Sequence, residues 1–209
     1  MGRHMSENPF FSIWLTPRKT IQQILQTPLN QETFLLICVL GIGNLISRAA
    51  AESLGDLVSV TGILIGALLV GPFAGMLTIW LWAVALQVTG RWLGGMAERS
   101  SLRTALAWGL VPTAVATLLW IPKLLIFGPE LFLSESPWLN SHPLLMGLRA
   151  AFEGGEFLLW LESMILLSQA IAEVQGYSSA WRGFGNLMLA LLILSTMILS
   201  LVGMALLFR

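Results

Sequence analysis

Charge is scarce in this 209-residue sequence, where Asp, Glu, Lys and Arg make up 11% of the residues and hydrophobic residues make up 56%. Soluble domains carry about 25% charged residues, so this chain has too little charge to coat a water-soluble globule. High hydrophobicity with low charge also excludes intrinsic disorder. Because the 11 basic and 11 acidic residues cancel, no basic field is available to hold nucleic acid. The remaining class is an integral membrane protein.

Cysteine and histidine are almost absent. The single cysteine, Cys38, excludes a disulfide framework and a CxxC zinc site. One histidine, His4, falls in residues 1–4, which we interpret as an expression-tag remnant, and the other, His142, falls in a polar loop. The sequence also has no HExxH, P-loop or nucleophile-elbow pattern. We therefore expect no metal, no cofactor and no enzymatic activity.

Long apolar runs, in contrast, are abundant, and they predict an all-α, polytopic membrane protein built as a bundle of five transmembrane helices. A helix crosses the ~30 Å hydrocarbon core in roughly 20 residues. The first run ends at Arg48 or extends past it. The runs define a transmembrane domain over 33–209, with spans at about 33–53, 57–88, 102–127, 150–172 and 184–208.

The second run is longer than one crossing requires. Residues 57–88 contain no charge and would form a helix of about 48 Å. Gly71-Pro72 interrupts the run, and proline removes a helix hydrogen bond. One long kinked helix or a re-entrant hairpin of two half-helices would fit. We favour the long helix, because half-helices leave backbone groups unsatisfied unless protein buries them.

The segment 5–32 has a different pattern, which predicts a short amphipathic helix in the cytosolic headgroup region. Thr16-Pro17 is a helix-start signal. Ile21, Ile24 and Leu25 then share one face, which we expect to contact acyl chains. The alternative is a cap that packs on the ends of the spans. The expected membrane-interface residues are Phe10, Phe11, Trp14, Arg18 and Lys19.

Basic residues near the spans predict the orientation. With the N-terminus inside, the inner segments hold Arg18, Lys19, Arg91, Arg99, Arg103 and Arg182, and the outer segments hold Arg48, Lys123, Arg149 and Arg209. This bias favours a multi-pass protein of the cytoplasmic (inner) membrane with its N-terminus in the cytoplasm and its C-terminus outside.

Small residues recur at the spacing that lets helices approach closely in lipid. We favour packing within the bundle over a dimer face, although a homo-oligomer stays open. The expected helix-packing residues are Gly62, Gly66, Gly71, Gly75, Gly109 and Pro112.

Three glutamates in the fourth run are costly at membrane depth and form a candidate polar pocket. Glu153 and Glu156 share a face near the outer end of the run, and Glu162 lies nearer its middle. The three glutamates would either form a proton-linked site or only hold the packing of the helices. Glu153 and Glu156 would also tolerate exposure at the membrane–water interface. We expect Glu162 to be protonated or bonded to a hydroxyl or carbonyl of a neighbouring helix.

Three motifs carry a family resemblance that covers nearly the whole chain. Ile13-Trp14-Leu15-Thr16-Pro17-Arg18-Lys19-Thr20-Ile21, before the first span, resembles the opening of bacterial members of the Yip domain family. Leu93-Gly94-Gly95, Ser101-Leu102-Arg103, and then Gly109 and Pro112 are similar to that family's glycine pair, small polar residue and Gly-x-x-Pro helix. Glu173-Val174-Gln175-Gly176-Tyr177-Ser178 is similar to the turn before its last span.

The resemblance implies a five-helix membrane domain with a cytosolic N-terminus. In eukaryotic members it implies vesicle traffic and binding of Ypt/Rab GTPases. This chain has nothing like their cytosolic Asp-Leu-Tyr-Gly-Pro element, so we do not expect a GTPase partner. The expected function is a non-enzymatic membrane protein that organises lipids or protein partners. The alternative is a small transporter or channel that uses the fourth-span glutamates.

Overall fold

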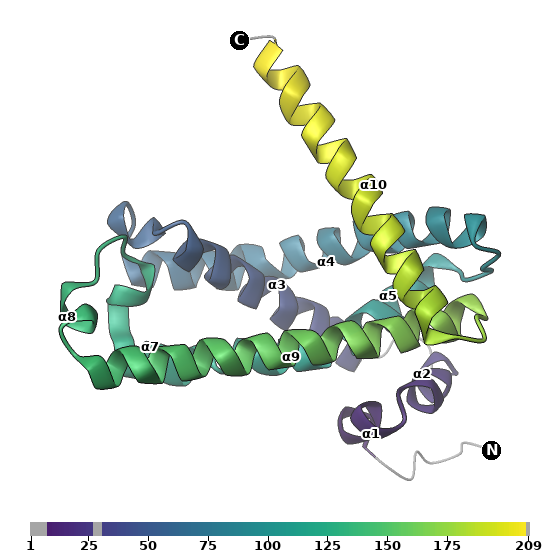
Figure 1. Cartoon of the computed structure of the whole chain (residues 1–209), viewed down its shortest axis with the longest axis horizontal. Helices are drawn as coiled ribbons and strands as arrows, with labels where there is room; N and C mark the ends of the chain where they lie inside the picture. The colour runs from purple at the N-terminus through teal and green to yellow at the C-terminus, as the bar shows by residue number, and fades with distance from the viewer. Residues whose placement is uncertain (1–7, 27–30, 208–209) are drawn as a thin grey trace. The chain divides into compact units, whose positions relative to one another are not determined.

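The computed structural model of the chain describes residues 8–26 and 31–207, so the tag remnant expected at 1–4 lies outside the described residues. The regular structure in these two ranges is helical, without a strand (Figure 1). Five helices are long and apolar enough to cross a membrane, which confirms the predicted all-α class with five spanning helices. The elements are α1 (Pro9–Leu15), α2 (Pro17–Leu25), α3 (Gln31–Ala51), η1 (Leu54–Asp56), α4 (Val60–Trp92), α5 (Arg99–Gly109), α6 (Val111–Leu118), α7 (Trp120–Phe127), η2 (Gly128–Phe132), α8 (Pro137–Asn140), α9 (Pro143–Gln175) and α10 (Ala180–Leu207).

The second apolar run forms one helix. Helix α4 continues through Pro72 over 33 residues, so the structure contains the long helix and not the re-entrant hairpin. Helix α3 likewise continues past Arg48 to Ala51, because three alanines after the arginine favour continued helix. Arginine at a span end can reach the membrane surface with its long side chain.

The third run differs from the single span expected over 102–127. The structure places its first part in α5, which ends at Gly109, and the apolar stretch that is long enough to span is Val111–Phe132. Pro112 lies in the first turn of α6. Proline is favoured at a helix start and cannot continue a preceding helix, since it lacks the N–H that the helix requires.

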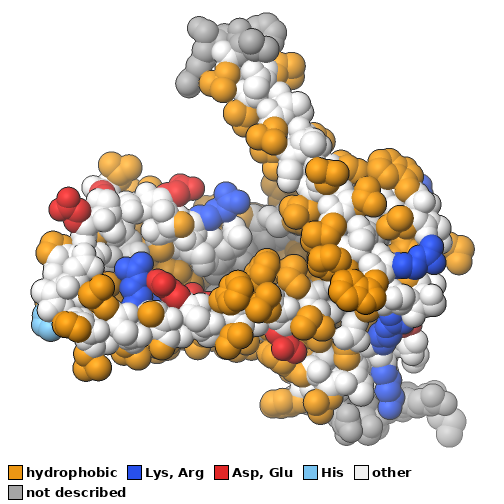
Figure 2. All heavy atoms as spheres, viewed as in Figure 1, with side chains coloured by type: hydrophobic (Ala, Val, Ile, Leu, Met, Phe, Trp, Pro, Cys, Tyr) orange, Lys and Arg blue, Asp and Glu red, His pale blue; other side chains and the backbone are white. Residues whose placement is uncertain are grey.

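Contacts divide the chain into two compact units. The described part of unit 1 comprises residues 8–26, 79–109 and 164–207, and that of unit 2 comprises residues 31–78 and 110–163. Helices α4 and α9 contribute residues to both units. Hydrophobic side chains cover much of the visible surface of α9 and α10 (Figure 2), as expected for helices whose solvent is lipid.

Unit 1 is built around α5. Leu102, Ala105 and Trp108 have no exposed surface, because α5 turns an apolar face to its neighbours and seven of its residues are buried. Helices α1 and α2 lie side by side, and α2 packs against α5 (Figure 1). The Phe10 ring adds a contact at 4.9 Å between its centroid and that of Trp108.

Unit 2 depends on a close approach of α3 to α4. A Cβ at Gly41 would collide with the Gly71 carbonyl oxygen, and a Cβ at Gly75 would collide with the Ile37 carbonyl oxygen. Two helix backbones can come this near only where both lack side chains. Beyond this crossing the core continues through residues from α3, α4, α7, η2 and α8, including Ile46, Ile63, Trp120, Phe127 and Phe132.

The expected packing glycines differ in what surrounds them. Gly71 and Gly75 lie at the α3–α4 crossing, and a Cβ at Gly109 would press on Leu167 of α9. A Cβ at Gly62 would meet only Val58 and Ser59 of the preceding turn, and one at Gly66 would meet open space. The Gly62-xxx-Gly66 pair is therefore not part of the contact between α3 and α4.

We expect Gly75→Ala to lower the thermal unfolding midpoint of the protein in detergent. The added methyl would press on the backbone of α3, which cannot rotate aside, and overpacking of this kind costs about 1–3 kcal/mol. Gly66→Ala is the matched control, since its methyl meets nothing within 4 Å. Circular dichroism melts that give the two variants equal midpoints would contradict the close crossing.

Candidate functional site

Unit 2 holds an ion pair between two spanning helices. Lys123 of α7 donates from Nζ to Glu156 Oε1 of α9 at 2.7 Å, and the lysine side chain is only 6% exposed. The ammonium also lies 4.3 Å from the centroid of the Trp120 ring. A charge at membrane depth is costly unless it is paired, and the carboxylate and the aromatic face together compensate this one.

Trp120 extends the same network to a third helix. Its indole Nε1 donates to Ser47 Oγ of α3 at 3.3 Å, and its ring stacks on Phe132 at 5.7 Å between centroids. The network thus ties α3, α7 and α9 together inside unit 2. Such an arrangement fixes helix positions, since each polar group has its partner on a different helix.

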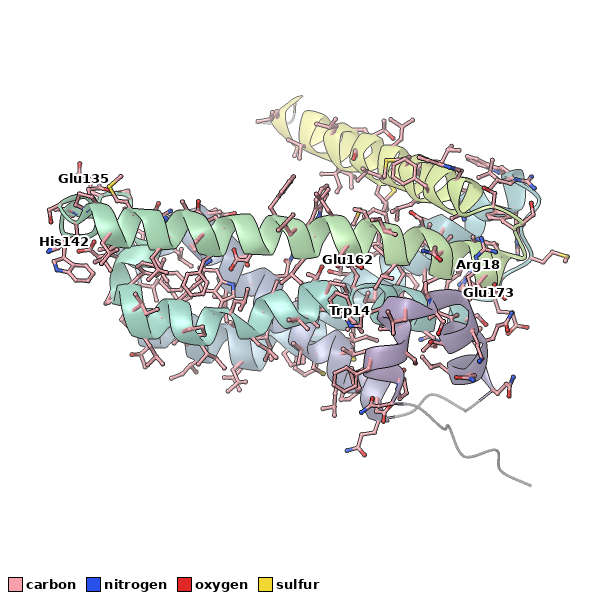
Figure 3. All side chains as sticks on the ribbon, turned by 60° about the horizontal axis from the view of Figure 1, so that its bottom comes forward. Trp14, Arg18, Glu135, His142, Glu162 and Glu173 are labelled. Carbon is pink, nitrogen blue, oxygen red and sulfur yellow. The ribbon has the colours of Figure 1, made fainter. Side chains whose placement is uncertain are left out.

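The three glutamates of the candidate pocket do not share a partner. Glu153 is exposed and bonds to Arg149 one turn earlier at 2.8 Å, which matches the alternative of simple exposure. Glu156 is the partner of Lys123. Glu162, labelled in Figure 3 on α9, is half-buried and has no hydrogen bond or ion pair within residues 8–26 and 31–207. The hydroxyl bond expected there is made instead by Ser163, with Thr113 at 2.8 Å.

A polar hollow of about 370 Å³ lies elsewhere in unit 2. Its walls come from the end of α3 and the turn after it, from the 131–136 segment, from α8 and from α9, and none of the three glutamates is among its lining residues. Arg149 reaches it while paired with Glu153. In the two described ranges no three His, Cys, Asp or Glu side chains cluster as a metal site requires.

Unit 1 contains a second polar cluster, which we call the junction. Gln175 at the end of α9 donates from Nε2 to the Leu86 carbonyl oxygen at 3.0 Å and accepts from the Ala97 N–H at 3.1 Å. The same side chain occupies the space that a Cβ would need at Gly90 and Gly95. A glutamine buried to 2% exposure thereby satisfies its amide and fixes the 93–98 loop against α4.

Tyr177 and Asn186 complete the junction. The Tyr177 hydroxyl donates to the Gly90 carbonyl oxygen at 3.0 Å. Thr89 donates to Asn186 Oδ1 at 2.6 Å, and both side chains have no exposed surface. Burial raises the pKa of the Tyr177 phenol, while the nearby Arg182 guanidinium acts in the opposite direction. Because α9 ends at Gln175, the tyrosine lies in the turn outside the spanning helices.

The N-terminal helices pack on this junction. Arg18 donates to the Tyr177 carbonyl oxygen at 3.3 Å and lies 4.0 Å from a Glu173 oxygen, as Figure 3 shows at the end of α9. Ile21 and Ile24 are buried, with 0% and 3% exposure. They do not face acyl chains as expected, because the apolar face of α2 is used on α5. The alternative, a cap packing on the protein, describes α2.

The expected membrane-interface residues therefore divide into a half-buried group, Phe10, Trp14 and Arg18, and an exposed group, Phe11 and Lys19. Arg18 is engaged with Glu173, and Phe10 is half-buried against Trp108. Phe11 is 75% exposed, and Leu15, which the sequence did not single out, is 85% exposed on the same short helix. Trp14, labelled in Figure 3, is half-buried, and Lys19 is exposed.

Sequence reasoning missed Lys123 as the partner of Glu156, and it missed Thr89, Gln175 and Asn186 as a buried network. Two signals pointed to them. A lone lysine in an apolar run requires a carboxylate nearby. Glutamine and asparagine at the two sides of a Gly-Tyr turn require buried partners when the adjoining helices are apolar.

Comparisons with known proteins give one match. The family model described as Yip1 domain matches residues 11–203. No curated protein matches the chain, and no solved structure matches it. The matched residues contain all of unit 2 and all of unit 1 except its two chain ends, so they include the ion pair and the junction.

We expect Lys123→Ala to destabilise the protein by about 3 kcal/mol, because it leaves the half-buried Glu156 carboxylate without its cation. The combined change Lys123→Met with Glu156→Leu should recover most of this loss, since it removes both charges. Unfolding of purified protein in detergent measures both effects. Arg149→Ala, which breaks an exposed pair, should cost under about 1 kcal/mol, and an equal cost for both single alanine variants would contradict the assignment.

Alkaline pH should weaken unit 1 through Tyr177, the one tyrosine of the chain. The pKa of Tyr177 in the folded protein lies above the ordinary value of 10.0. Its contribution to the free energy of unfolding is therefore complete below pH 10 and is lost as the pH rises through the folded pKa. Ultraviolet titration of tyrosinate should give a midpoint above that of a denatured control. Tyr177→Phe should remove this alkaline component. Coincident midpoints in folded and denatured protein would contradict it.

Proposed function

This chain belongs to the Yip1 domain family, and on that basis we propose that it is a non-enzymatic, multi-pass protein of the cytoplasmic membrane that organises membrane lipids or protein partners. Family membership and five apolar helices support the membrane part of the proposal. The two polar clusters support a scaffold role. Within each cluster the polar groups form hydrogen bonds with one another, and these bonds hold helices of the same unit together.

One observation carries the proposal: an exposed apolar pair on a helix that is otherwise fixed to the protein. Phe11 and Leu15 are four residues apart, so they share one face of α1. The opposite face of α1 is anchored, since Ile13 is buried and Ser12 accepts a hydrogen bond from Thr20 at 3.0 Å. A large apolar pair held outward in this way is stabilised by insertion among lipid headgroups and upper acyl chains.

Charge supports a cytoplasmic position for this helix. The described part of unit 1 carries six basic and two acidic residues, whereas that of unit 2 carries three basic and eight acidic residues. The described residues before the first span, residues 93–109 between the second and third spans, and the turn between the fourth and fifth spans all belong to unit 1. Basic residues concentrate on the cytoplasmic side of membranes, so we assign these segments, and the N-terminus, to the cytoplasm.

A transporter or channel role is the second candidate, and one observation favours it. Glu162 is half-buried at the centre of α9 without a hydrogen-bonding partner among the residues that the structure describes, as a proton site would be. Glu156 does not favour it, because Lys123 already neutralises its charge. Proteoliposome flux compared between wild type and Glu162→Gln separates the two functions: the scaffold predicts no flux in either.

Reconstitution into vesicles tests the scaffold. Phe11 and Leu15 would act as a wedge, because they insert into one leaflet only and so raise its curvature. We therefore expect the wild-type protein to reduce the mean vesicle diameter, measured by dynamic light scattering and electron microscopy. Phe11→Ser with Leu15→Ser should abolish the reduction while leaving the melting temperature in detergent within a few degrees. Gln23→Ala, an exposed change on the next helix, is the control. Equal diameters for wild type and the double variant would refute the proposal.

A further inference from the structure

We propose that unit 1 presents a binding surface for anionic phospholipid headgroups around the 93–98 loop. This surface, the basic–aromatic rim, consists of Arg91, Trp92, Met96, Arg99, Trp181 and Arg182. The inference deepens the proposed function and rests on its membrane placement, because it names the class of lipid that this side of the protein recruits.

The cations of the rim are not neutralised by the protein. Arg99 donates from Nε to the neutral amide oxygen of Gln87 at 2.7 Å, and Arg182 donates to the Leu93 carbonyl oxygen at 3.1 Å. Arg91 is exposed and has no hydrogen bond or ion pair from its side chain within residues 8–26 and 31–207. Neutral acceptors orient a guanidinium while leaving its charge and its remaining N–H groups available to phosphate.

Carboxylates of the same unit compensate them only in part. Of the two acidic residues in the described part of unit 1, Glu173 is bonded to Gln22 and Arg18. Glu98 is exposed in the loop itself and accepts a hydrogen bond from Ser100 but forms no ion pair with Arg91, Arg99 or Arg182, so one negative charge stands beside the three positive charges of the rim. In unit 2, by contrast, Lys123 and Arg149 both have carboxylate partners. The rim therefore carries a local positive field that an anionic surface would balance.

The apolar members of the rim select a membrane rather than a free anion. Trp92, Met96 and Trp181 are 66%, 88% and 80% exposed. Each tryptophan is adjacent in sequence to an arginine of the rim, and tryptophan beside basic residues is the pattern of side chains at headgroup level. A soluble phosphate would use the arginines alone and would leave these three side chains unfavourably in water.

The junction holds the rim in one arrangement. Gln175 and Tyr177 fix the 93–98 loop and the end of α4 by the hydrogen bonds described above. Arg182 spans from the first turn of α10 to the loop and lies over the Tyr177 ring at 5.2 Å. The rim is thus preorganised, which lowers the entropic cost of holding a headgroup. Figure 2 shows Lys and Arg side chains gathered near the start of α10 and over the N-terminal helices.

The test measures lipid retention by full-length protein in nanodiscs of phosphatidylcholine mixed with phosphatidylglycerol, using spin-labelled analogues of each lipid. We expect phosphatidylglycerol to be immobilised several-fold more strongly than phosphatidylcholine, and high salt to weaken this preference. Arg91→Gln with Arg99→Gln should reduce the preference at least twofold. The matched control, Arg48→Gln with Arg149→Gln, removes two arginines of unit 2, one exposed and one half-buried, and should leave the preference unchanged.

Other outcomes would overturn the proposal. Equal retention of the two lipids by wild type, or equal loss in the control variant, would show that no such surface exists. Complete competition by inorganic phosphate would assign the arginines to a free anion. Melting temperatures of both variants establish that they are folded. Vesicle diameter, set by Phe11 and Leu15, is measured separately, so failure of the wedge and failure of the rim are distinguishable.

Discussion

A polar side chain in an apolar interior must find its partner within the protein, and in unit 1 the Gln175 amide meets this constraint for several elements at once. Its two hydrogen bonds join α4, the 93–98 loop and the end of α9. The glycines at 90 and 95 leave the space that the glutamine fills. Because an unsatisfied amide in such a place costs several kcal/mol, the loop and both helix ends are held together.

Unit 2 meets the same constraint with charge and with close backbone contact. Lys123 and Glu156 neutralise each other between α7 and α9, and Trp120 connects the lysine to α3. The α3–α4 crossing is achieved without polar side chains, since Gly41 and Gly75 let the backbones approach. The hydrophobic effect contributes little to the association of helices in lipid. The ion-pair network and the glycine crossing therefore stabilise the helix packing that apolar burial stabilises in soluble proteins.

The sequence was sufficient to predict which segments form helices, but it was insufficient to predict which segments those helices pack against. Apolar run length predicted five spanning helices and the continuity of α4, because both follow from local composition and backbone hydrogen bonding. The run 102–127 was predicted as one crossing although Pro112 interrupts it, and the structure ends α5 at Gly109, just before that proline. Whether Ile21 faces lipid or protein depends on whether α5 offers an apolar face, and periodicity within α2 is the same in both cases.

Which polar groups pair with one another depends on contacts between segments that are far apart in the chain. Lys123 and Glu156 are 33 residues apart, and Gln175 meets Leu86 at a separation of 89 residues. Composition signalled that each of these polar groups needed a partner but contained no information on which one. Two of the motifs behind the family resemblance meet at the junction, because Gln175 and Tyr177 of the 173–178 motif fill the space beside Gly95 of Leu93-Gly94-Gly95.

The junction holds the 93–98 loop against α4 and the end of α9 through the hydrogen bonds of Gln175. Hydrogen–deuterium exchange of the full-length protein in lipid nanodiscs tests this directly, with the Ala97 amide as the reporter, because its N–H donates to Gln175. We expect slow exchange across this loop in the wild-type protein and fast exchange in Gln175→Leu, with exchange in α3 unchanged. Fast exchange of the loop in the wild-type protein would contradict it.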